Sequence, residues 1–221
     1  MNQEEAPAER LPSGRHRLPR EVVLESQRRR IIEAMIASVG TNGYEGTSVA
    51  DVLERAGVSR ATFYEHFSDK LDCFLAAHDS LVDSLLAGVG QVCSGAGDWT
   101  ARVRSALAGL VERFAAHPGE ARVALVEVTA TGPDGRRRYR TALQRFTPFL
   151  EEGYDHAELR RELSALTLRM AVGSVASILF EEVAAGRAES LPDRVGELTF
   201  AALAPLLGPE AAARAAEQDR A

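Results

Sequence analysis

The sequence is poor in cysteine, in aromatic residues and in long apolar runs. The shortages of cysteine and of long apolar runs each exclude a class of protein. Only two of the 221 residues are cysteines, Cys73 and Cys93, so a scaffold held together by disulfides is excluded. They do not form a C-x-x-C pair, and we expect two reduced, buried thiols with no metal site. Aromatic residues make up 6% of the chain. No cofactor is expected.

The longest apolar run is too short to cross a membrane. Residues 170–180 read MAVGSVASILF and lie between Arg169 and Glu181, whereas a bilayer core is about 30 Å thick and needs about 20 helical residues. The first twenty residues are polar and contain proline, so no signal peptide is expected. We therefore expect a cytoplasmic protein with no membrane partner.

Alternating strand patterns are scarce, and helical periods recur along the chain. Apolar residues repeat at three- and four-residue intervals, and glycine or proline separates the repeats. The pattern predicts an all-α fold of about nine helices.

Charge is distributed unevenly. The chain holds 26 basic and 32 acidic residues, a net charge of −6, which taken alone argues against a nucleic-acid ligand. Residues 10–30, however, contain seven arginines against only Glu21 and Glu25. This basic arm could lie along phosphates or enter a minor groove, or it could be a solubilising tail.

The most informative segment begins with a short, well-delimited helix. Ser48 is followed three residues later by Asp51, a spacing typical of a capping box, because the two side chains can satisfy free backbone N–H groups. Gly57 then fits a left-handed C-cap. The pattern predicts a helix over residues 49–56 and a tight turn.

A second short helix follows. Ser59 is a suitable N-cap, and Phe63 and Phe67 lie one turn apart on the predicted inner face. Helix, glycine turn and helix together form a helix-turn-helix pattern. The outer face consists of small, hydroxyl-bearing, aromatic and basic residues, namely Arg60, Ala61, Thr62, Tyr64 and His66.

Such a face can lie in a major groove. Arg60, near the helix start, could reach base edges, while Tyr64, His66 and the nearby Lys70 could bind phosphate oxygens. Paired short helices joined by glycine also occur in proteins that never contact DNA, so the pattern leaves both interpretations open.

Residues 27–85 resemble the DNA-binding domain of the TetR family of bacterial transcriptional regulators. The resemblance rests on Ala56-Gly57-Val58-Ser59, Thr62-Phe63-Tyr64, His66-Phe67 and Lys70. It implies base contacts from Arg60, Ala61 and Thr62. It implies phosphate contacts from Thr47, Ser48, Tyr64, His66 and Lys70.

The resemblance also implies a domain plan. Residues 1–20 would be a flexible basic arm and residues 21–70 the three-helix helix-turn-helix domain. Residues 71–207 would form a helical ligand-binding and dimerisation domain, followed by a tail over residues 208–221.

No catalytic signature is present, whether G-x-S-x-G, H-E-x-x-H, G-x-G-x-x-G or a P-loop, so we do not expect an enzyme. The resemblance implies a cavity for a small, partly apolar effector, although its candidate residues could equally be ordinary core. The candidate ligand-binding residues are Trp99, Arg102, Phe114, Glu127, Phe146, Phe149, Arg169, Met170 and Phe180.

The resemblance further implies that the last two long helices form a four-helix dimer interface, although they could instead pair in a monomer core. The candidate interface residues are Leu166, Met170, Gly173, Ser177, Phe180, Leu198, Ala202 and Leu206. We thus expect a homodimeric, ligand-responsive repressor that binds a near-palindromic DNA operator and is released by a small molecule. The alternative is a helical protein-interaction or ligand-binding module without specific DNA binding.

Overall fold

A computed structural model describes residues 19–153 and 164–217. Helices occupy most of these residues and no strand occurs among them, which confirms the all-α prediction. The chain divides into two compact units at Ala77 and His78, seven residues beyond the boundary expected from the sequence. The basic arm expected over residues 1–20 lies almost wholly outside the described residues.

The first unit is built from α1, Arg20–Gly46, α2, Val49–Ala56, and α3, Arg60–His66. The long helix α4, Lys70–Cys93, begins in this unit and ends in the second. Apolar side chains spaced one helical turn apart form the core of the first unit. Its fully buried residues include Ile31, Met35, Val39, Val52, Phe63 and Phe74.

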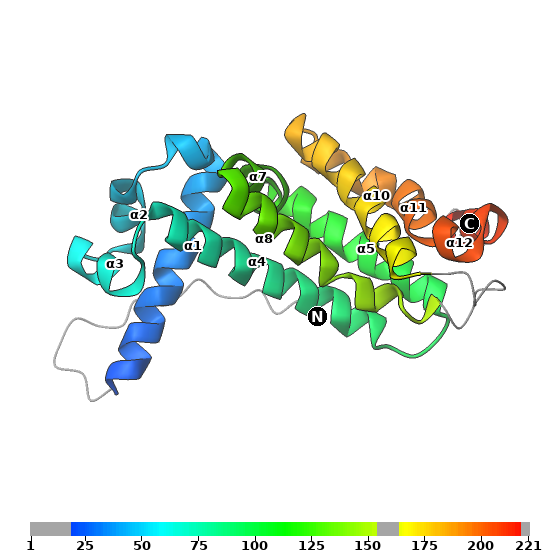
Figure 1. The fold of residues 1–221 in the computed structure, drawn as a ribbon, viewed down its shortest axis with the longest axis horizontal. Coiled ribbons are helices and arrows are strands. Elements are labelled where there is room, and N and C mark those ends of the chain that lie inside the picture. Colours follow the sequence, from blue (N-terminus) through cyan, green and yellow to red (C-terminus); the bar gives the residue numbers. More distant parts are fainter. Residues whose placement is uncertain (1–18, 154–163, 218–221) are drawn as a thin grey trace. The chain divides into compact units, whose positions relative to one another are not determined.

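The second unit packs further helices into a layered bundle (Figure 1). Its elements are α5 (Trp99–Ala116), α6 (Pro118–Ala121), the π-helix η1 (Arg122–Glu127), α7 (Val128–Ala130), α8 (Gly132–Gln144), the 3-10 helix η2 (Thr147–Leu150), α10 (Ala165–Ala184), the 3-10 helix η3 (Ala188–Arg194), α11 (Val195–Leu207) and α12 (Pro209–Glu217). His78, which the sequence places on an apolar face, is fully buried, with Nε2 3.3 Å from the Ala124 carbonyl oxygen.

Most of the segment that the sequence suggests to be only a tail, residues 209–217, is helical. Residues Pro209–Glu217 form α12, which packs against α11 and buries Ala212 and Ala215 (Figure 1). Alanine has no side-chain rotamer entropy to lose and is the best helix former. An alanine-rich segment can therefore form a closely packed helix although it has little apolar bulk.

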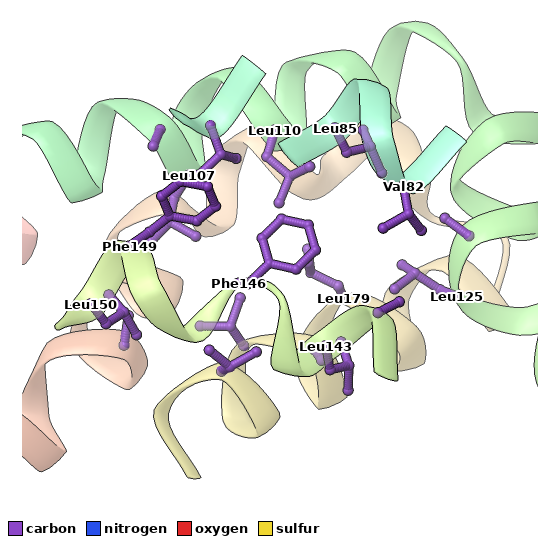
Figure 2. Close-up of a pocket in the computed structure, with 18 of the residues that line it drawn as sticks. Val82, Leu85, Leu107, Leu110, Leu125, Leu143, Phe146, Phe149, Leu150 and Leu179 are labelled. Carbon is purple, nitrogen blue, oxygen red and sulfur yellow. The ribbon is translucent and has the colours of Figure 1, made fainter. Parts of the chain in front are cut away.

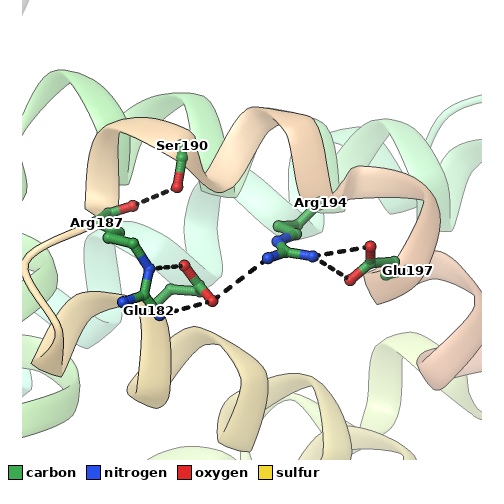
Figure 3. A network of polar contacts seen from close by, with 5 residues as sticks. All are labelled: Glu182, Arg187, Ser190, Arg194 and Glu197. Atoms are coloured by element: carbon green, nitrogen blue, oxygen red, sulfur yellow. Dashed lines mark hydrogen bonds and ion pairs between the residues drawn. The ribbon is translucent and has the colours of Figure 1, made fainter.

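A polar network fixes the connection between α10 and α11 (Figure 3). The Glu182 carboxylate accepts hydrogen bonds from Arg187 Nε at 2.8 Å and Nη2 at 3.1 Å. Arg194 lies 3.7 Å from the same carboxylate and donates to Glu197 at 2.9 Å. The bonds from Arg187 are the main cause that lowers the pKa of Glu182 below its usual value, followed by the charges of Arg187 and Arg194.

Of the described helices, α4 alone is long and apolar enough to span a membrane by length and composition. A helix in the core of a protein requires the same apolar side chains. Phe74, Ala77, Leu81, Val82 and Leu85 are all buried inside the protein.

Candidate nucleic-acid interface and effector cavity

The two short helices of the first unit are capped as their sequence predicts. The Ser48 hydroxyl accepts from the Asp51 backbone N–H, and the Asp51 carboxylate accepts from the Ser48 N–H at 2.7 Å, which completes a capping box. The hydrogen bonds that the Ser48 backbone N–H and the Ser48 hydroxyl donate to the Asp51 carboxylate lower the pKa of Asp51. Gly57 closes α2 at φ 62° and ψ 43°, a left-handed conformation that glycine adopts without strain.

The second helix begins at the predicted N-cap. The Ser59 hydroxyl accepts from the Thr62 N–H at 3.0 Å and also lies 3.0 Å from the Thr62 hydroxyl. Phe63 and Phe67 are 0% and 3% exposed, which confirms the predicted inner face. The caps and the aromatic pair together fix which side of α3 faces outward.

The outward side of α3 carries free hydrogen-bonding groups. Arg60, Ala61 and Tyr64 are exposed, and Thr62 is half-buried. Tyr64 is 49% exposed, and its ring meets the edge of the Phe63 ring with the centroids 5.3 Å apart. A guanidinium and a phenol on one short exposed helix match the donors that contact base edges and phosphates.

Two candidate phosphate contacts need correction. The Thr47 side chain is 1% exposed, and its hydroxyl donates to the Gly43 carbonyl at 2.8 Å. Lys70 Nζ donates to the carbonyl oxygens of Tyr44 at 2.9 Å and Thr47 at 3.0 Å, and it lies 4.1 Å from the Tyr44 ring centroid. The structure thus gives both side chains internal roles in holding the segment that leads into α2.

The other candidates of this region differ in exposure. Ser48 is exposed at the start of α2. His66 is half-buried, and its ring centroid lies 6.3 Å from that of Phe67. Glu65, which sequence reasoning left out, is exposed on α3. Its carboxylate can accept from a cytosine amino group and would repel phosphates.

Part of the basic segment that precedes the motif is used inside the first unit. Arg30 Nη1 donates to the Ala56 carbonyl at 2.9 Å, and the Arg28 guanidinium lies 4.7 Å from the Phe67 ring centroid. Arg29 is exposed and lies 3.9 Å from Glu33. A cation at the last carbonyls of α2 is favourable, because the helix dipole is negative there.

The second unit encloses an apolar cavity with an empty volume of about 890 Å³, part of it open to solvent (Figure 2). Its walls come from α4, α5, η1, α8, η2, α10 and α11. The lining residues are Val82, Leu85, Val89, Cys93, Val103, Ala106, Leu107, Leu110, Phe114, Ala124, Leu125, Tyr139, Ala142, Leu143, Phe146, Phe149, Leu150, Val172, Val175, Ala176, Leu179 and Ala202.

The structure gathers only some of the candidate effector residues around this cavity. Phe114, Phe146 and Phe149 line it, and Phe146 lies between its two ends in Figure 2. Trp99 is buried but does not line the cavity, and Phe180 is half-exposed on α10. The aliphatic wall residues on α4 carry no distinguishing motif, because their spacing is that of any core helix.

The charged candidates lie elsewhere. Arg102 forms an ion pair with Glu152 and donates from Nε to the Cys93 carbonyl at 2.9 Å. Glu127 is 8% exposed and accepts from Arg122 Nη2 at 2.5 Å. Arg169 and Met170 line a second pocket with an empty volume of about 580 Å³.

The candidate interface residues separate into two groups. On α10, Leu166 and Met170 are 58% and 60% exposed, Ser177 is exposed, and Gly173 and Phe180 are half-buried along the same stripe. On α11, Leu198, Ala202 and Leu206 are at most 5% exposed. These three residues form core within one chain, because α12 and α10 pack against α11, and their assignment to an interface is wrong. Phe200, which the sequence did not single out, is 40% exposed on α11.

Within the described ranges, no group of three or more His, Cys, Asp and Glu side chains could hold a metal ion. Both cysteines are free, with Cys73 buried and Cys93 half-buried.

Comparison with known proteins finds a family model that matches part of the first unit. Residues 31–77 match the family model described as bacterial regulatory proteins, tetR family. Over 106 residues the chain is 31% identical to the HTH-type transcriptional activator FasR of Mycolicibacterium smegmatis, which covers 48% of each protein. The chain thus matches about half the length of that curated relative.

Solved structures share the fold over most of the chain. The fatty acid degradation regulator FadR from Bacillus halodurans superimposes with a TM-score of 0.69 at 19% identity, covering 81% of this chain and 94% of FadR. FadR from Bacillus subtilis, solved in complex with stearoyl-CoA, gives a TM-score of 0.68 at 17% identity and covers 81% and 97%. At these identities the likeness shows the fold alone.

Proposed function

We propose that this chain, whose residues 31–77 match the family model of tetR-family bacterial regulatory proteins, is a cytoplasmic TetR-family transcription regulator that binds operator DNA and responds to a small apolar effector. The observation that carries the proposal is the capped, outward-facing α3 in one unit together with an apolar cavity in the other. It acts by binding and not by catalysis, and the proteins it matches are named as regulators.

The proposed DNA contacts follow from exposure. Arg60, Ala61 and Thr62 face base edges, with Arg60 donating to guanine O6 and N7. Ser48, Tyr64 and His66 lie toward phosphates. Thr47 and Lys70 act indirectly, because they hold the α1–α2 connection through Gly43, Tyr44 and each other.

The protein would act as a homodimer. A single α3 of seven residues reads few bases, whereas two copies related by a dyad read a near-palindromic operator with half-sites about one DNA turn, about 34–36 Å, apart. The exposed stripe of α10 supports such an assembly, because Leu166 and Met170 leave large apolar surface uncovered in the monomer.

The effector would lower operator affinity by favouring a conformation that binds DNA less well. The apolar wall of the cavity supports an apolar ligand, and the stearoyl-CoA found in Bacillus subtilis FadR shows that this fold can hold a long acyl chain. We propose a repressor, although FasR is named an activator.

Selection of bound sequences from random DNA, followed by gel shifts over a salt series, tests the proposal. We expect a near-palindromic consensus and an affinity that falls steeply with salt, because each phosphate contact releases counterions. A protein that selects no sequence, or binds without salt dependence, would instead be a helical interaction module. Transcription from the selected operator, measured with and without the protein, gives the sign of regulation.

A further inference from the structure

The cavity wall contains almost no polar groups. Among its lining side chains only Cys93 and Tyr139 carry a polar atom. Burial raises the pKa of both groups, so they stay protonated and uncharged near neutral pH. An ionised ligand group inside would lose its hydration without gaining a charged partner, which costs several kcal/mol. The part of a ligand that enters this cavity is therefore uncharged and apolar.

The cavity is also elongated. Four lining residues of α4, Val82, Leu85, Val89 and Cys93, lie on one face of the helix. At 1.5 Å per residue they cover about 16 Å, the extended length of about twelve methylene carbons. In Figure 2, Val82 and Leu125 lie at one end and Phe149 at the other. This shape favours a single aliphatic chain over a compact ring system.

The second pocket adjoins the cavity and has more polar and charged residues in its lining, although half of its lining residues are apolar. Leu143 on α8 and Val172 on α10 line both pockets. The second pocket adds two exposed arginines, Arg140 on α8 and Arg169 on α10, together with Gln144, Thr147 and the apolar Leu166 and Met170 of the α10 stripe. None of the described residues that line it is acidic.

The two arginines differ from several neighbours in having no carboxylate partner among the described residues. On or next to α8, Arg137 pairs with Asp134, Arg138 with Asp79, and Arg145 with Asp83. Within residues 19–153 and 164–217, neither Arg140 nor Arg169 forms an ion pair or a side-chain hydrogen bond. Two uncompensated guanidinium groups beside one pocket are suited to a carboxylate or phosphate, which both bind by charge-assisted hydrogen bonds.

We propose that the effector is a single-chain amphiphile whose aliphatic tail fills the apolar cavity and whose anionic head group is held by Arg140 and Arg169. This inference rests on the proposed function in one respect, namely that the cavity holds an effector. It adds the chemical class of that effector and assigns a head-group site.

The test is a calorimetric titration of the full-length protein with twelve-carbon ligands kept below their micelle concentrations. Dodecanoate, dodecyl phosphate and dodecanoyl-CoA carry anionic heads, 1-dodecanol a neutral head and dodecyltrimethylammonium a cationic head. The variants are the double substitution R140Q/R169Q and, as a matched control, R136Q. Arg136 is exposed on the same helix but lines neither pocket. Sedimentation of each variant checks that its oligomeric state is unchanged.

We expect at least one anionic ligand to bind about tenfold more tightly than the alcohol, with the cation weakest. R140Q/R169Q should remove that advantage and leave the alcohol affinity unchanged, while R136Q alters neither. Whether the carboxylate or a phosphate-bearing ligand binds best identifies the head group.

Other results overturn the inference. They are equal affinity for acid and alcohol, an unchanged preference in R140Q/R169Q, or no binding of any twelve-carbon chain. A cavity-filling variant, Ala176→Leu, should weaken the binding of all the twelve-carbon chains alike, and unaltered affinities there would place the tail elsewhere. Operator binding is measured separately on the ligand-free wild type. Its absence would overturn the proposed function without touching the ligand result.

Discussion

The Lys70 ammonium donates to the backbone oxygen of Thr47 over 3.0 Å, and the first residue of α4 thereby holds the entry to α2. The same ammonium donates to the Tyr44 carbonyl and lies over the Tyr44 ring. Lys70 is the only lysine in the chain. Its charge is used to stabilise the first unit.

Lys70→Met should therefore reduce stability more than it changes the salt dependence of DNA binding. Leaving two carbonyl oxygens without their donor is expected to cost about 1–3 kcal/mol of unfolding free energy. Urea unfolding measures this loss. The slope of log affinity against log salt should stay within error of the wild type. A slope that falls by about one unit would make Lys70 a phosphate contact.

Arg60→Ala should weaken operator binding by about 1–3 kcal/mol and relax selectivity at one base position. The exposed guanidinium lies at the first residue of α3, outside the aromatic core, so its loss should leave folding intact. Gel shifts with the selected operator and its single-base variants measure both effects. The control is Arg136→Ala, which removes the same charge from α8. Unchanged operator affinity would remove Arg60 from the interface.

Ser177→Arg should dissociate the proposed dimer. Ser177 is exposed on the α10 stripe that includes Leu166 and Met170, and a bulky cation there would be desolvated opposite its own copy. We expect the dimer dissociation constant to rise at least tenfold, or about 1.4 kcal/mol, as measured by analytical ultracentrifugation. Ala87→Arg, an exposed position on α4, should have no effect. A dimer that survives Ser177→Arg assembles through another surface.

Glu182→Gln should remove a pH-dependent contribution to stability. The bonds from Arg187 lower the pKa of Glu182 in the folded protein below the usual value of 4.5. The folded state therefore binds its proton less readily than the unfolded state, and the contribution is present above the unfolded pKa. It is lost as the pH falls through the folded pKa. Wild-type and Glu182→Gln melting temperatures should differ at pH 7 and converge in strong acid. A difference that is constant with pH would contradict the assignment.

The two thiols should react at different rates. Burial raises the pKa of Cys73 to about 12, and its side chain is 0% exposed. Cys93 is half-buried on the cavity wall and has a smaller upward shift. Because the thiolate is the reactive form, iodoacetamide at mildly alkaline pH should label Cys93 first. Mass spectrometry of the digested protein gives the order, and ligands that fill the cavity should slow the Cys93 reaction. Faster labelling of Cys73 would contradict its burial.

Local features of the first unit could be predicted from the sequence because each depends on residues a few positions apart. Ser48, Gly57 and Ser59 act as caps through their own side chains or backbone freedom. The internal roles of Thr47 and Lys70 could not be predicted. They depend on the break at Gly43, which has φ 75° inside α1 and brings the carbonyls of Gly43, Tyr44 and Thr47 within reach.

In the second unit, periodicity distinguished apolar from polar faces but not which neighbour covers each face. Leu198, Ala202 and Leu206 have the spacing of an interface, yet α12 and α10 cover them within the same chain. The residues that line the cavity could not be predicted from the sequence either, because an apolar residue on a cavity wall has the same sequence pattern as one in a filled core. Only the arrangement of α4, α5, α8 and α10 leaves the space.

An apolar cavity inside a folded chain lowers the free energy of unfolding, because the atoms of its wall lack the dispersion contacts of a filled core. A ligand that fills the cavity binds the folded chain and not the unfolded one. At a free ligand concentration of one hundred times the dissociation constant, it adds about 2.7 kcal/mol to the free energy of unfolding. Chains without ligand would unfold more often and be degraded sooner. The abundance of the regulator, and not only its affinity for DNA, would then follow the supply of its ligand.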